Sequence, residues 1–577
     1  MARPQSEVSP LGKWAAGGVL SSRHVLWLVL AAFIIGLFLY GPALGGGFVF
    51  DDEGLPFRRG FQDEPIASWL LGVRPILMFT YWLNSAASGN DPRGYHLLNL
   101  LIHAVNTGLV FAVLFRLLSL AGWDLARRRI AAVGGAAIFL VHPLATESVS
   151  YIAGRSESLA AMFMLLAWVV FLNASGQPIS WRRSTVVVAL FGLAVAAKEN
   201  AVALVGVLLL TDVFWPKPFS LERLRQNRRL HFLIAPGFAA GLAWVARVLA
   251  DAGSAGFKVQ GVAWYQYAFT QSRAIFKYLQ LAALPFGQSL DHDFPVSRTL
   301  AEHGALWCLL ALAAITAAAI AFRRRYPLAC FGWLLFLVLL APTSSVVPIA
   351  DPLVERRMYL PLFALLLVAC EAVRRRWSES TAAIVAVVAF AFAVLCYHHN
   401  QLWAHPDRLW ARAALESKQK GRPYWHLAET LIAENRCSEA VPYLARGERL
   451  MPADYSIQVA WGKTLECMGR PEDALHRLER AAVIRPDSRV YQWIGLLEGE
   501  MGRKDAAGLA LQQAVRLNPR DSSAHSALGL WYESLGNAPC ALREYRAALT
   551  SDPHNNEALG GLGRLEILGT ASAPGGQ

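Results

Sequence analysis

Two adjacent carboxylates, Asp51 and Asp52, open the first polar loop of the chain, directly after an apolar stretch. Adjacent carboxylates repel each other, so one of them is expected to keep its proton to a higher pH and to serve as a base near neutrality. A solvated cap that simply ends a hydrophobic segment has the same pattern. The spacing does not separate the roles of Asp51 and Asp52, and Glu53 is a weaker third candidate.

More polar residues follow in this loop and in the next apolar helix. Arg74 precedes a proline, and His96, Asn99 and His103 are spaced i, i+3 and i+7, which places all three on one helical face. Polar groups inside a membrane usually face a cavity or a partner helix. Hydrogen bonding between helices explains them as well. Metal binding is the weakest explanation, because no third ligand has a matching spacing.

Three later segments carry similar groups. His142 and Arg155 bound a polar stretch, Lys198 and Glu199 form a charged turn between two apolar spans, and Arg356 lies in Glu-Arg-Arg-Met-Tyr-Leu-Pro. A charged turn also arises where side chains reach the membrane surface by snorkelling. Acids and bases beside apolar helices suit a substrate with an anionic head and an apolar tail, such as a lipid-linked phosphate.

Apolar stretches long enough to span a membrane position these loops. The 577 residues are 55% apolar and only 17% charged, whereas soluble domains carry about 25% charged residues. A spanning helix needs about 20 apolar residues. The sequence predicts about eleven spans, near 24–46, 96–118, 129–143, 157–174, 184–197, 200–215, 231–250, 303–322, 326–341, 358–373 and 380–397.

Basic residues set the orientation. With eleven spans, the basic clusters all fall on one side, which is then cytoplasmic. Residues 265–284 are expected to lie on the membrane surface as an amphipathic helix rather than to cross. The net charge of +12 is therefore an orientation signal and does not predict nucleic-acid binding. The N-terminus is predicted to be cytoplasmic, and the chain after Tyr397 extracytoplasmic.

The C-terminal part repeats with a period of 33 to 34 residues. One ladder of small residues is Ala428, Gly462, Gly495, Gly529 and Gly563; others are Asn435, Gly469, Gly502 and Gly536, and Ala440, Ala474, Ala507 and Ala541. This helix-turn-helix period resembles the tetratricopeptide repeat (TPR). We expect four repeats and a capping helix, with a concave groove that binds peptides or proteins.

Seven cysteines, none in a CxxC pair, predict neither a zinc site nor a redox motif. Cys437 and Cys467 lie in adjacent repeats, and their spacing permits a disulfide bond without demanding one.

The order of these motifs resembles the transmembrane-and-TPR protein O-mannosyltransferases and their bacterial relatives, which are GT-C glycosyltransferases. The resemblance covers residues of about 50–560 and rests on Arg74-Pro, Thr80, Asn84, His96, Asn99, His103, His142-Pro, Thr146-Glu147, Arg155, Lys198-Glu199, Glu355-Arg356 and Tyr359-Leu360-Pro361. Two departures are the residues Glu-Gly-Leu-Pro after Asp52, and Arg357 where an aromatic residue is commoner. Recognition of the donor is expected to differ accordingly.

The resemblance implies transfer of a sugar, mannose or another hexose, from a polyprenyl-phosphate donor to a hydroxyl group, with serine or threonine of a protein as acceptor. Asp51 or Asp52 would take the hydroxyl proton. Cations stabilise the departing phosphate, and the candidate donor-binding residues are Arg74, His96, His103, His142, Arg155, Lys198, Glu199 and Arg356. The pattern indicates no protein-bound cofactor, and it leaves room for a divalent metal without indicating one.

The predicted all-α organisation is therefore a cytoplasmic segment at 1–23, a transmembrane GT-C-like domain at 24–400, a linker helix at 401–420, an extracytoplasmic TPR domain at 421–569 and a tail at 570–577. Expected partners are membrane lipid, a lipid-linked sugar, and acceptor or partner proteins in the TPR groove. A bacterial inner membrane is the expected location. One competing hypothesis is a membrane-anchored TPR scaffold without catalysis; another is a transporter of lipid-linked sugars, which is disfavoured because the polar groups gather at one surface.

Overall fold

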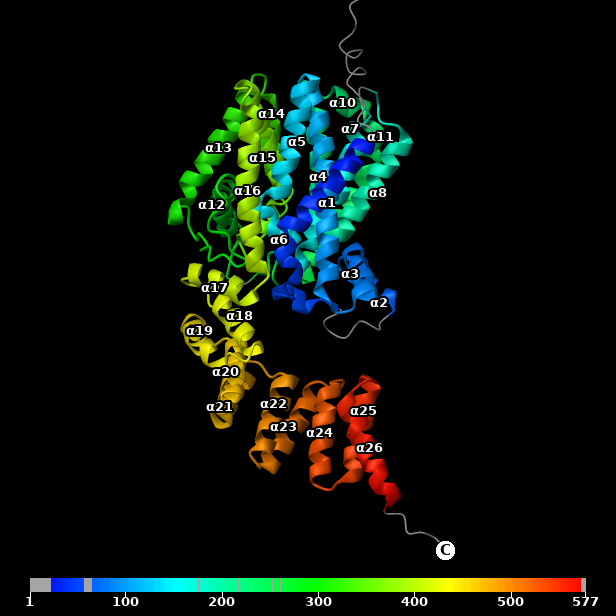
Figure 1. Ribbon diagram of the computed structural model, residues 1–577, viewed down its shortest axis with the longest axis vertical. Coiled ribbons are helices and arrows are strands. Elements are labelled where there is room, and N and C mark those ends of the chain that lie inside the picture. The colour runs from blue at the N-terminus through cyan, green and yellow to red at the C-terminus, as the bar shows by residue number, and fades with distance from the viewer. Residues whose placement is uncertain are drawn as a thin grey trace, which may run out of the picture. The chain divides into compact units, whose positions relative to one another are not determined.

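The computed structural model describes residues 22–56, 65–174, 177–215, 217–251, 253–259 and 261–571. The expected cytoplasmic segment 1–23 and the tail 570–577 lie almost wholly outside these ranges. Among the described residues the chain is helical and contains no β-strand (Figure 1). It divides into two compact units, Met1–Leu409 and Trp410–Gln577, and the division falls in α17 (Pro406–Glu416), inside the range expected for the linker. Each unit is described by itself.

The first unit has a helix at each of the eleven apolar stretches of the sequence. They are α1 (Ser22–Leu39), α4 (Pro92–Leu120), α5 (Leu125–Val141), α7 (Arg155–Leu172), α8 (Trp181–Ala197), α9 (Ala203–Phe214), α11 (Arg228–Asp251), α13 (Ala305–Ala321), α14 (Pro327–Leu340), α15 (Pro361–Arg375) and α16 (Thr381–Trp403). Five of the described helices are long and apolar enough to cross a membrane alone, and the number rises to seven if two bent helix pairs are each one span. The chain is a membrane protein.

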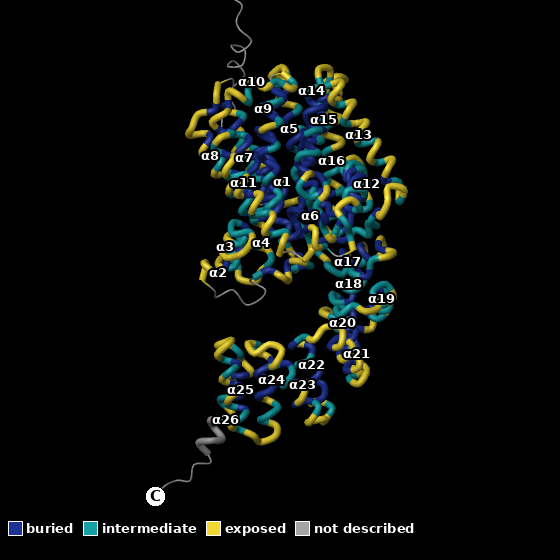
Figure 2. Tube along the Cα trace, turned by 180° about the vertical axis from the view of Figure 1, so that it is seen from behind, coloured by how far each residue is buried: buried dark blue, intermediate teal, exposed yellow. Residues whose placement is uncertain are grey.

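Burial separates the inner helices from those that face lipid. The most apolar windows of α4 and of the helical stretch containing α7 are 78% and 67% buried within the protein, whereas those of α11, α13 and α16 are at most 11% buried. Figure 2 shows the exposed segments on the loops and on the outer faces of helices. An apolar helix that the protein leaves uncovered is stable only if lipid covers it, so α11, α13 and α16 form part of the lipid-facing surface.

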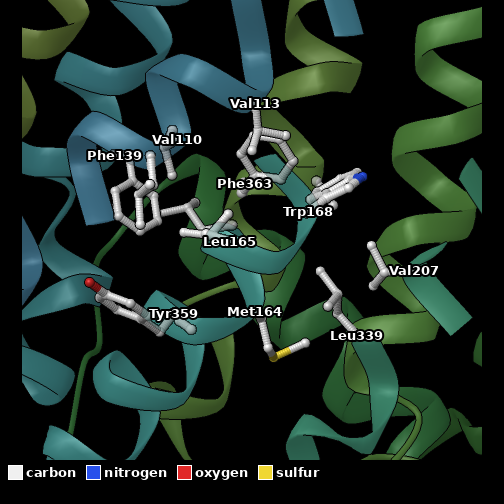
Figure 3. Packing of buried hydrophobic residues seen from close by; sticks show 14 of the residues in the cluster. Val110, Val113, Phe139, Met164, Leu165, Trp168, Val207, Leu339, Tyr359 and Phe363 are labelled. Atoms are coloured by element: carbon white, nitrogen blue, oxygen red, sulfur yellow. The ribbon is translucent and has the colours of Figure 1, made fainter. Parts of the chain in front are cut away.

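Large apolar side chains of α4, α5, α7 and α15 interlock in the centre of this unit (Figure 3). Val113, Phe139 and Phe363 are fully buried there. The ring of Trp168 meets that of Phe363 edge to face, with 5.5 Å between the centroids. This packing fixes the ends of the helices from which the polar loops begin.

Short helices build those polar loops. They are η2 (Gly41–Gly45), η3 (Phe50–Gly54), α2 (Ile66–Leu70), α3 (Pro75–Ser88), η6 (Pro143–Ala145), α6 (Thr146–Val149), η7 (Ile152–Gly154), η8 (Glu199–Val202), α10 (Glu222–Gln226), η9 (Glu302–Gly304) and η10 (Glu355–Met358). The segment expected on the membrane surface is α12 (Trp264–Ala283). It exposes Trp264 and Tyr265 but buries Tyr267 and Tyr278, whose hydroxyls donate to the carbonyls of Thr343 and Val354.

The second unit contains four helix pairs and a last helix, as the repeat predicts: α18 (Arg422–Ala433) with α19 (Cys437–Leu450), α20 (Tyr455–Cys467) with α21 (Pro471–Ile484), α22 (Ser488–Glu500) with α23 (Lys504–Leu517), α24 (Ser522–Ser534) with α25 (Ala538–Ser551), and α26 (Asn556–Ala571). The ladders have direct structural reasons. A Cβ added at Gly462, Gly495 or Gly529 would lie within 2.7 Å of a side chain of the paired helix, so each helix crossing needs a small residue.

The second ladder marks the turns between paired helices. Asn435, Gly469, Gly502 and Gly536 all have φ between 59° and 78°. This left-handed conformation is strained for most residues and is tolerated best by glycine and asparagine. The alanines of the third ladder are at most 1% exposed, which leaves no room there for a larger side chain.

Cys437 and Cys467 form a disulfide bond between the start of α19 and the end of α20, the pairing that the spacing permits. The bond closes a loop of 30 residues in sequence, and such a cross-link stabilises a fold by about 2–4 kcal/mol, mainly by restricting the unfolded chain.

We expect a Cys437→Ser/Cys467→Ser variant to have a free energy of unfolding that is lower by about 2–4 kcal/mol. The variant should therefore unfold at a lower temperature than the wild type, as measured by thermal unfolding under oxidising conditions. Adding reductant should lower the midpoint of the wild type and leave that of the variant unchanged. Equal midpoints for the two oxidised proteins would contradict the prediction.

Candidate active site

Loops from three parts of the first unit meet at the end of the bundle where α1 ends and α7 begins. η3 carries Asp51 and Asp52, the stretch from α6 to η7 carries Glu147 and Tyr151, and η10 carries Arg356. Gly154 allows the closest approach within this group: an added Cβ would lie 2.3 Å from the carbonyl oxygen of Glu147. The residue before Arg155 is therefore required to be glycine.

Asp52 is a buried anchor of the first loop. Its side chain is 1% exposed, and its two carboxylate oxygens accept the backbone N–H groups of Val49, at 3.1 Å, and Ala153, at 2.7 Å. Burial raises the pKa of Asp52 to about 8, and the nearby Asp51 and Glu53 carboxylates add smaller increments. The sequence indicates a raised pKa through repulsion between neighbours. In the structure, desolvation is the main cause.

Asp51 is the accessible member of the pair. Its side chain is 53% exposed and its carboxylate lies 3.8 Å from the guanidinium of Arg356. The backbone N–H of Asp51 donates to the hydroxyl of Tyr151 at 2.9 Å, which fixes the turn. Asp51 can therefore touch a substrate while Asp52 holds the loop in place.

Arg356 faces both Asp51 and a buried carboxylate. Its guanidinium donates to Glu147 at 2.6 Å, its backbone N–H donates to the same carboxylate at 2.8 Å, and its side chain stays 21% exposed. Burial alone would lower the pKa of Arg356, but the carboxylate of Glu147 outweighs this effect and raises it. A permanently charged guanidinium with an exposed edge suits an anionic ligand.

Two further ion pairs link the start of η8 to neighbouring elements: Arg74–Glu199 links it to the start of α3, and Lys198–Glu157 links it to α7. Arg74 binds Glu199 through two hydrogen bonds of 2.9 and 2.5 Å. Burial disfavours the Glu199 carboxylate, but Arg74 outweighs this effect and lowers the pKa of Glu199 to about 2. Lys198 pairs with Glu157 and also donates to Ser156 at 3.3 Å.

Lys198 lies close enough to Arg74 and to Arg356 for their charges to act on it. The pKa of Lys198 is lowered chiefly by burial, against the effect of Glu157, and then by the positive charges of Arg74 and Arg356. Cations held close together repel, and a polyvalent anion relieves this repulsion. Arg74, Lys198 and Arg356 thus form one cationic group, of which Arg74 and Arg356 are the more exposed members.

Arg155 lies in the interior of the protein, and its role in donor binding stays a prediction from the sequence. Its side chain is completely buried. Its guanidinium donates to the side chain of Asn99 at 2.6 Å and to backbone carbonyls of Tyr95, at 3.0 Å, and Thr80, at 3.3 Å. The ring of Tyr81 covers one face, with its centroid 4.5 Å from the guanidinium carbon. In this structure Arg155 joins helices.

The three candidate histidines are also enclosed. His96, His103 and His142 are at most 4% exposed and lie near the backbone carbonyls of Gly46, Leu140 and Ala282. His103 also contacts the hydroxyl of Tyr359 at 2.8 Å. These contacts are those expected for hydrogen bonding between helices, and the assignment of the three histidines to donor binding stays a prediction. In the described part of the chain, no group of three or more His, Cys, Asp or Glu residues is arranged to hold a metal ion.

Tyr151, Glu147 and Glu157 belong to this site, although the sequence did not single them out as site residues. Tyr151 lies under the Arg356 guanidinium, 5.7 Å from its carbon, and stacks on Trp403. Glu157 accepts from Asn200 at 3.1 Å in addition to Lys198. All three lie in the polar stretch 142–157. Their position in a polar stretch between two apolar spans is the feature of the sequence that could have identified them as site residues.

The pH dependence of stability tests the burial of Asp52. The pKa of about 8 in the folded chain exceeds the value of about 4 expected in an unfolded one. The folded state therefore binds more protons between these values, and stability falls as pH rises from about 4 to about 8. We expect the difference in unfolding midpoint between wild type and Asp52→Asn to fall across this window and to level off above it. A difference that is constant with pH would contradict this prediction.

The fold and site define a multispanning membrane protein with a charged, loop-built site beside apolar helices and a TPR unit. The chain is similar to protein O-mannosyl-transferase TMTC3 of Mus musculus, with 30% identity over 204 residues, and to Tmtc2 of Drosophila melanogaster, with 32% identity over 204 residues. These matches cover 32% and 30% of this chain but only 21% and 20% of the relatives. A longer match, to Drosophila Tmtc3, has 21% identity over 519 residues and covers 77% of this chain and 54% of that protein. The resemblance to the transmembrane-and-TPR protein O-mannosyltransferases is thereby confirmed.

No protein-family model matches the chain. Among solved structures, the crystal structure of MamA aligns with 25% of this chain and 85% of its own, with 23% identity and a TM-score of 0.24. A thermophilic TPR protein of Thermus thermophilus aligns with 30% of this chain and 95% of its own, with 22% identity and a TM-score of 0.26.

Proposed function

We propose that this protein is a membrane glycosyltransferase that moves a hexose from a polyprenyl-phosphate donor to a hydroxyl group, with serine or threonine of a protein as acceptor. The observation that carries the proposal is the exposed Asp51 carboxylate, which lies 3.8 Å from Arg356, a member of the cationic group. Mannose is the preferred sugar because the relatives are named protein O-mannosyl-transferases.

The geometry divides the roles in transfer. Asp51 takes the proton of the acceptor hydroxyl, whose oxygen attacks the anomeric carbon of the sugar. The bond from that carbon to the phosphate oxygen breaks, and its electron pair leaves with the lipid phosphate. Arg356 and Arg74 contact the phosphate, and Lys198 adds positive charge from behind, because negative charge grows on this group in the transition state. Asp52, held by two backbone N–H groups, positions Asp51.

An extracytoplasmic location of the site and of the TPR unit is part of the proposal. The disulfide bond between Cys437 and Cys467 supports it, because such bonds persist in oxidising compartments. The distribution of basic clusters favours the same orientation.

The groove of the TPR unit is the proposed site for acceptor or partner proteins. α18, α20 and α22 line a groove of about 800 Å³ with the aromatic residues Trp425, Tyr455 and Trp493. Arg485 and Arg489 add positive charge to it. Aromatic and arginine side chains are the residue types that contribute most at protein interfaces.

Mass spectrometry of whole proteins and of glycopeptides tests the proposal in cells that express either the wild type or an Asp51→Asn/Asp52→Asn variant. We expect a hexose-sized mass on serine or threonine of extracytoplasmic proteins that disappears with the variant. Protein level and membrane insertion of the variant are measured in parallel. Unchanged protein masses with a normally inserted variant would refute transfer to protein, and extracted lipids and glycans are then compared in the same way. No difference in any of these fractions would favour the non-catalytic TPR scaffold.

A further inference from the structure

An apolar groove runs along the lipid-facing side of the first unit, between α3, α8 and α11. It has a volume of about 740 Å³. From α8 it is lined by Phe191, Gly192 and Val195, and from α11 by Gly237, Gly241 and Trp244. Gly192 and Val195 on α8, and Gly237, Gly241 and Trp244 on α11, are three or four residues apart, so on each helix these positions share one face. Small residues hollow out the groove, and aromatic rings form part of its walls.

The groove opens toward lipid. The apolar window of α11 is only 11% buried within the protein, and Gly192 is exposed. A Cβ added at Gly192 would meet no atom within 4 Å. A chain dissolved in the bilayer can therefore enter the groove sideways, without passing through water.

One end of the groove lies at the cationic group. Val73 and Pro75 line the groove and flank Arg74 in sequence. A Cβ added at Gly241 would lie 3.5 Å from Val202, which belongs to the η8 turn that begins at Glu199. The apolar walls thus continue directly from the Arg74–Glu199 pair. An amphiphile with its anionic head at Arg74 would have the first part of its tail in the groove.

We propose that the groove between α8 and α11 holds the first isoprene units of the polyprenyl chain of the sugar donor. This assignment rests on the proposed function, because it assumes a lipid-phosphate donor at the cationic group. The tail moves from one apolar medium into another, so close packing rather than the hydrophobic effect supplies the gain. A modest contribution to donor affinity follows, about tenfold, which corresponds to about 1.4 kcal/mol.

Two donors of different tail length separate tail binding from head binding. The full chain is reconstituted in lipid nanodiscs and assayed with mannosyl phosphate carried on a long polyprenol or on methanol, which has no isoprene unit. Gly192→Leu and Ala240→Leu fill the groove, and neither site is buried. Ala314→Leu makes a similar change on the exposed, apolar α13 and serves as the matched control. We expect both groove variants to raise KM for the long donor about tenfold, with unchanged KM for the methyl donor. The control variant should change neither value.

Photo-crosslinking keeps this inference testable even without transfer. A polyprenyl phosphate with a diazirine on its first isoprene units is irradiated with the wild type and with the groove variants. We expect labelled peptides from α8 and α11, weaker labelling in the groove variants, and competition by unlabelled polyprenyl phosphate but not by phosphatidylglycerol. Equal competition by both lipids would overturn the proposal and show a groove filled by bulk lipid. Labelling confined to other helices, or groove variants that alter both donors equally, would also overturn it. If neither donor supports transfer while α8 and α11 are labelled specifically, the proposed function fails and the tail site stands.

Discussion

Replacing Asp51 by asparagine is expected to lower kcat for sugar transfer by about 100- to 10,000-fold, the contribution that a positioned general base usually makes. The amide keeps the shape of the side chain but cannot accept the hydroxyl proton. The Asp51 side chain is 53% exposed, so the variant should fold and insert normally. Its KM for the donor should change little, because Arg356, Arg74 and Lys198 remain in place. Steady-state kinetics with mannosyl citronellyl phosphate and a serine- or threonine-containing acceptor measure both parameters.

The control for this prediction lies two residues away. Glu53→Gln removes one negative charge from the same turn, and Glu53 is exposed as Asp51 is. A general loss of negative charge would affect both variants similarly, whereas loss of the base affects only Asp51→Asn. If Asp51→Asn keeps more than a tenth of wild-type kcat, Asp51 is not the base. A large loss in Glu53→Gln alone would move the role to that residue.

The helices of this protein could be predicted from the sequence because local patterns determine them. Apolar runs located the eleven long helices of the first unit. In the second unit, each ladder reports a local constraint: Gly462 and Gly495 at helix crossings, and Gly469 and Gly502 with positive φ. Such constraints depend on the residues within one repeat and its neighbour. The period of the sequence was therefore sufficient to predict the helix pairs of the second unit.

The roles of the charged residues could not be predicted in this way. Asp51 and Asp52 are adjacent and chemically identical, yet the η3 turn exposes one and buries the other. The Asp52 side chain is held by the N–H of Ala153, 101 residues away. Arg155 and Arg356 likewise both lie in polar loops, but only Arg356 keeps an exposed edge. Burial is a property of tertiary packing, and no spacing rule in a single sequence reports it.

Replacing Arg155 by methionine is expected to destabilise the first unit by about 1–3 kcal/mol, the usual cost of leaving a buried hydrogen-bonding group without its partner. Methionine fills much of the volume but donates no hydrogen bond. The side-chain oxygen of Asn99 would lose its partner in the interior, and the carbonyls of Tyr95 and Thr80, which lie within α4 and α3, would each lose one hydrogen bond. Each buried acceptor left without a partner costs about 1–3 kcal/mol. Thermal unfolding of the purified membrane protein, followed by size-exclusion chromatography after heating, measures the change.

Two variants separate this structural role from a role in donor binding. Arg127→Met removes a positive charge from an arginine whose side chain is 54% exposed, and it should leave the unfolding midpoint nearly unchanged. Arg356→Met removes a cation from the proposed site, and it should raise KM for the donor and lower kcat. Arg155→Met should instead lose folded protein, while the fraction that remains folded keeps its KM for the donor. If Arg155→Met unfolds at the wild-type temperature and has a raised KM, then Arg155 contacts the donor, and the guanidinium turns toward the site when substrate binds.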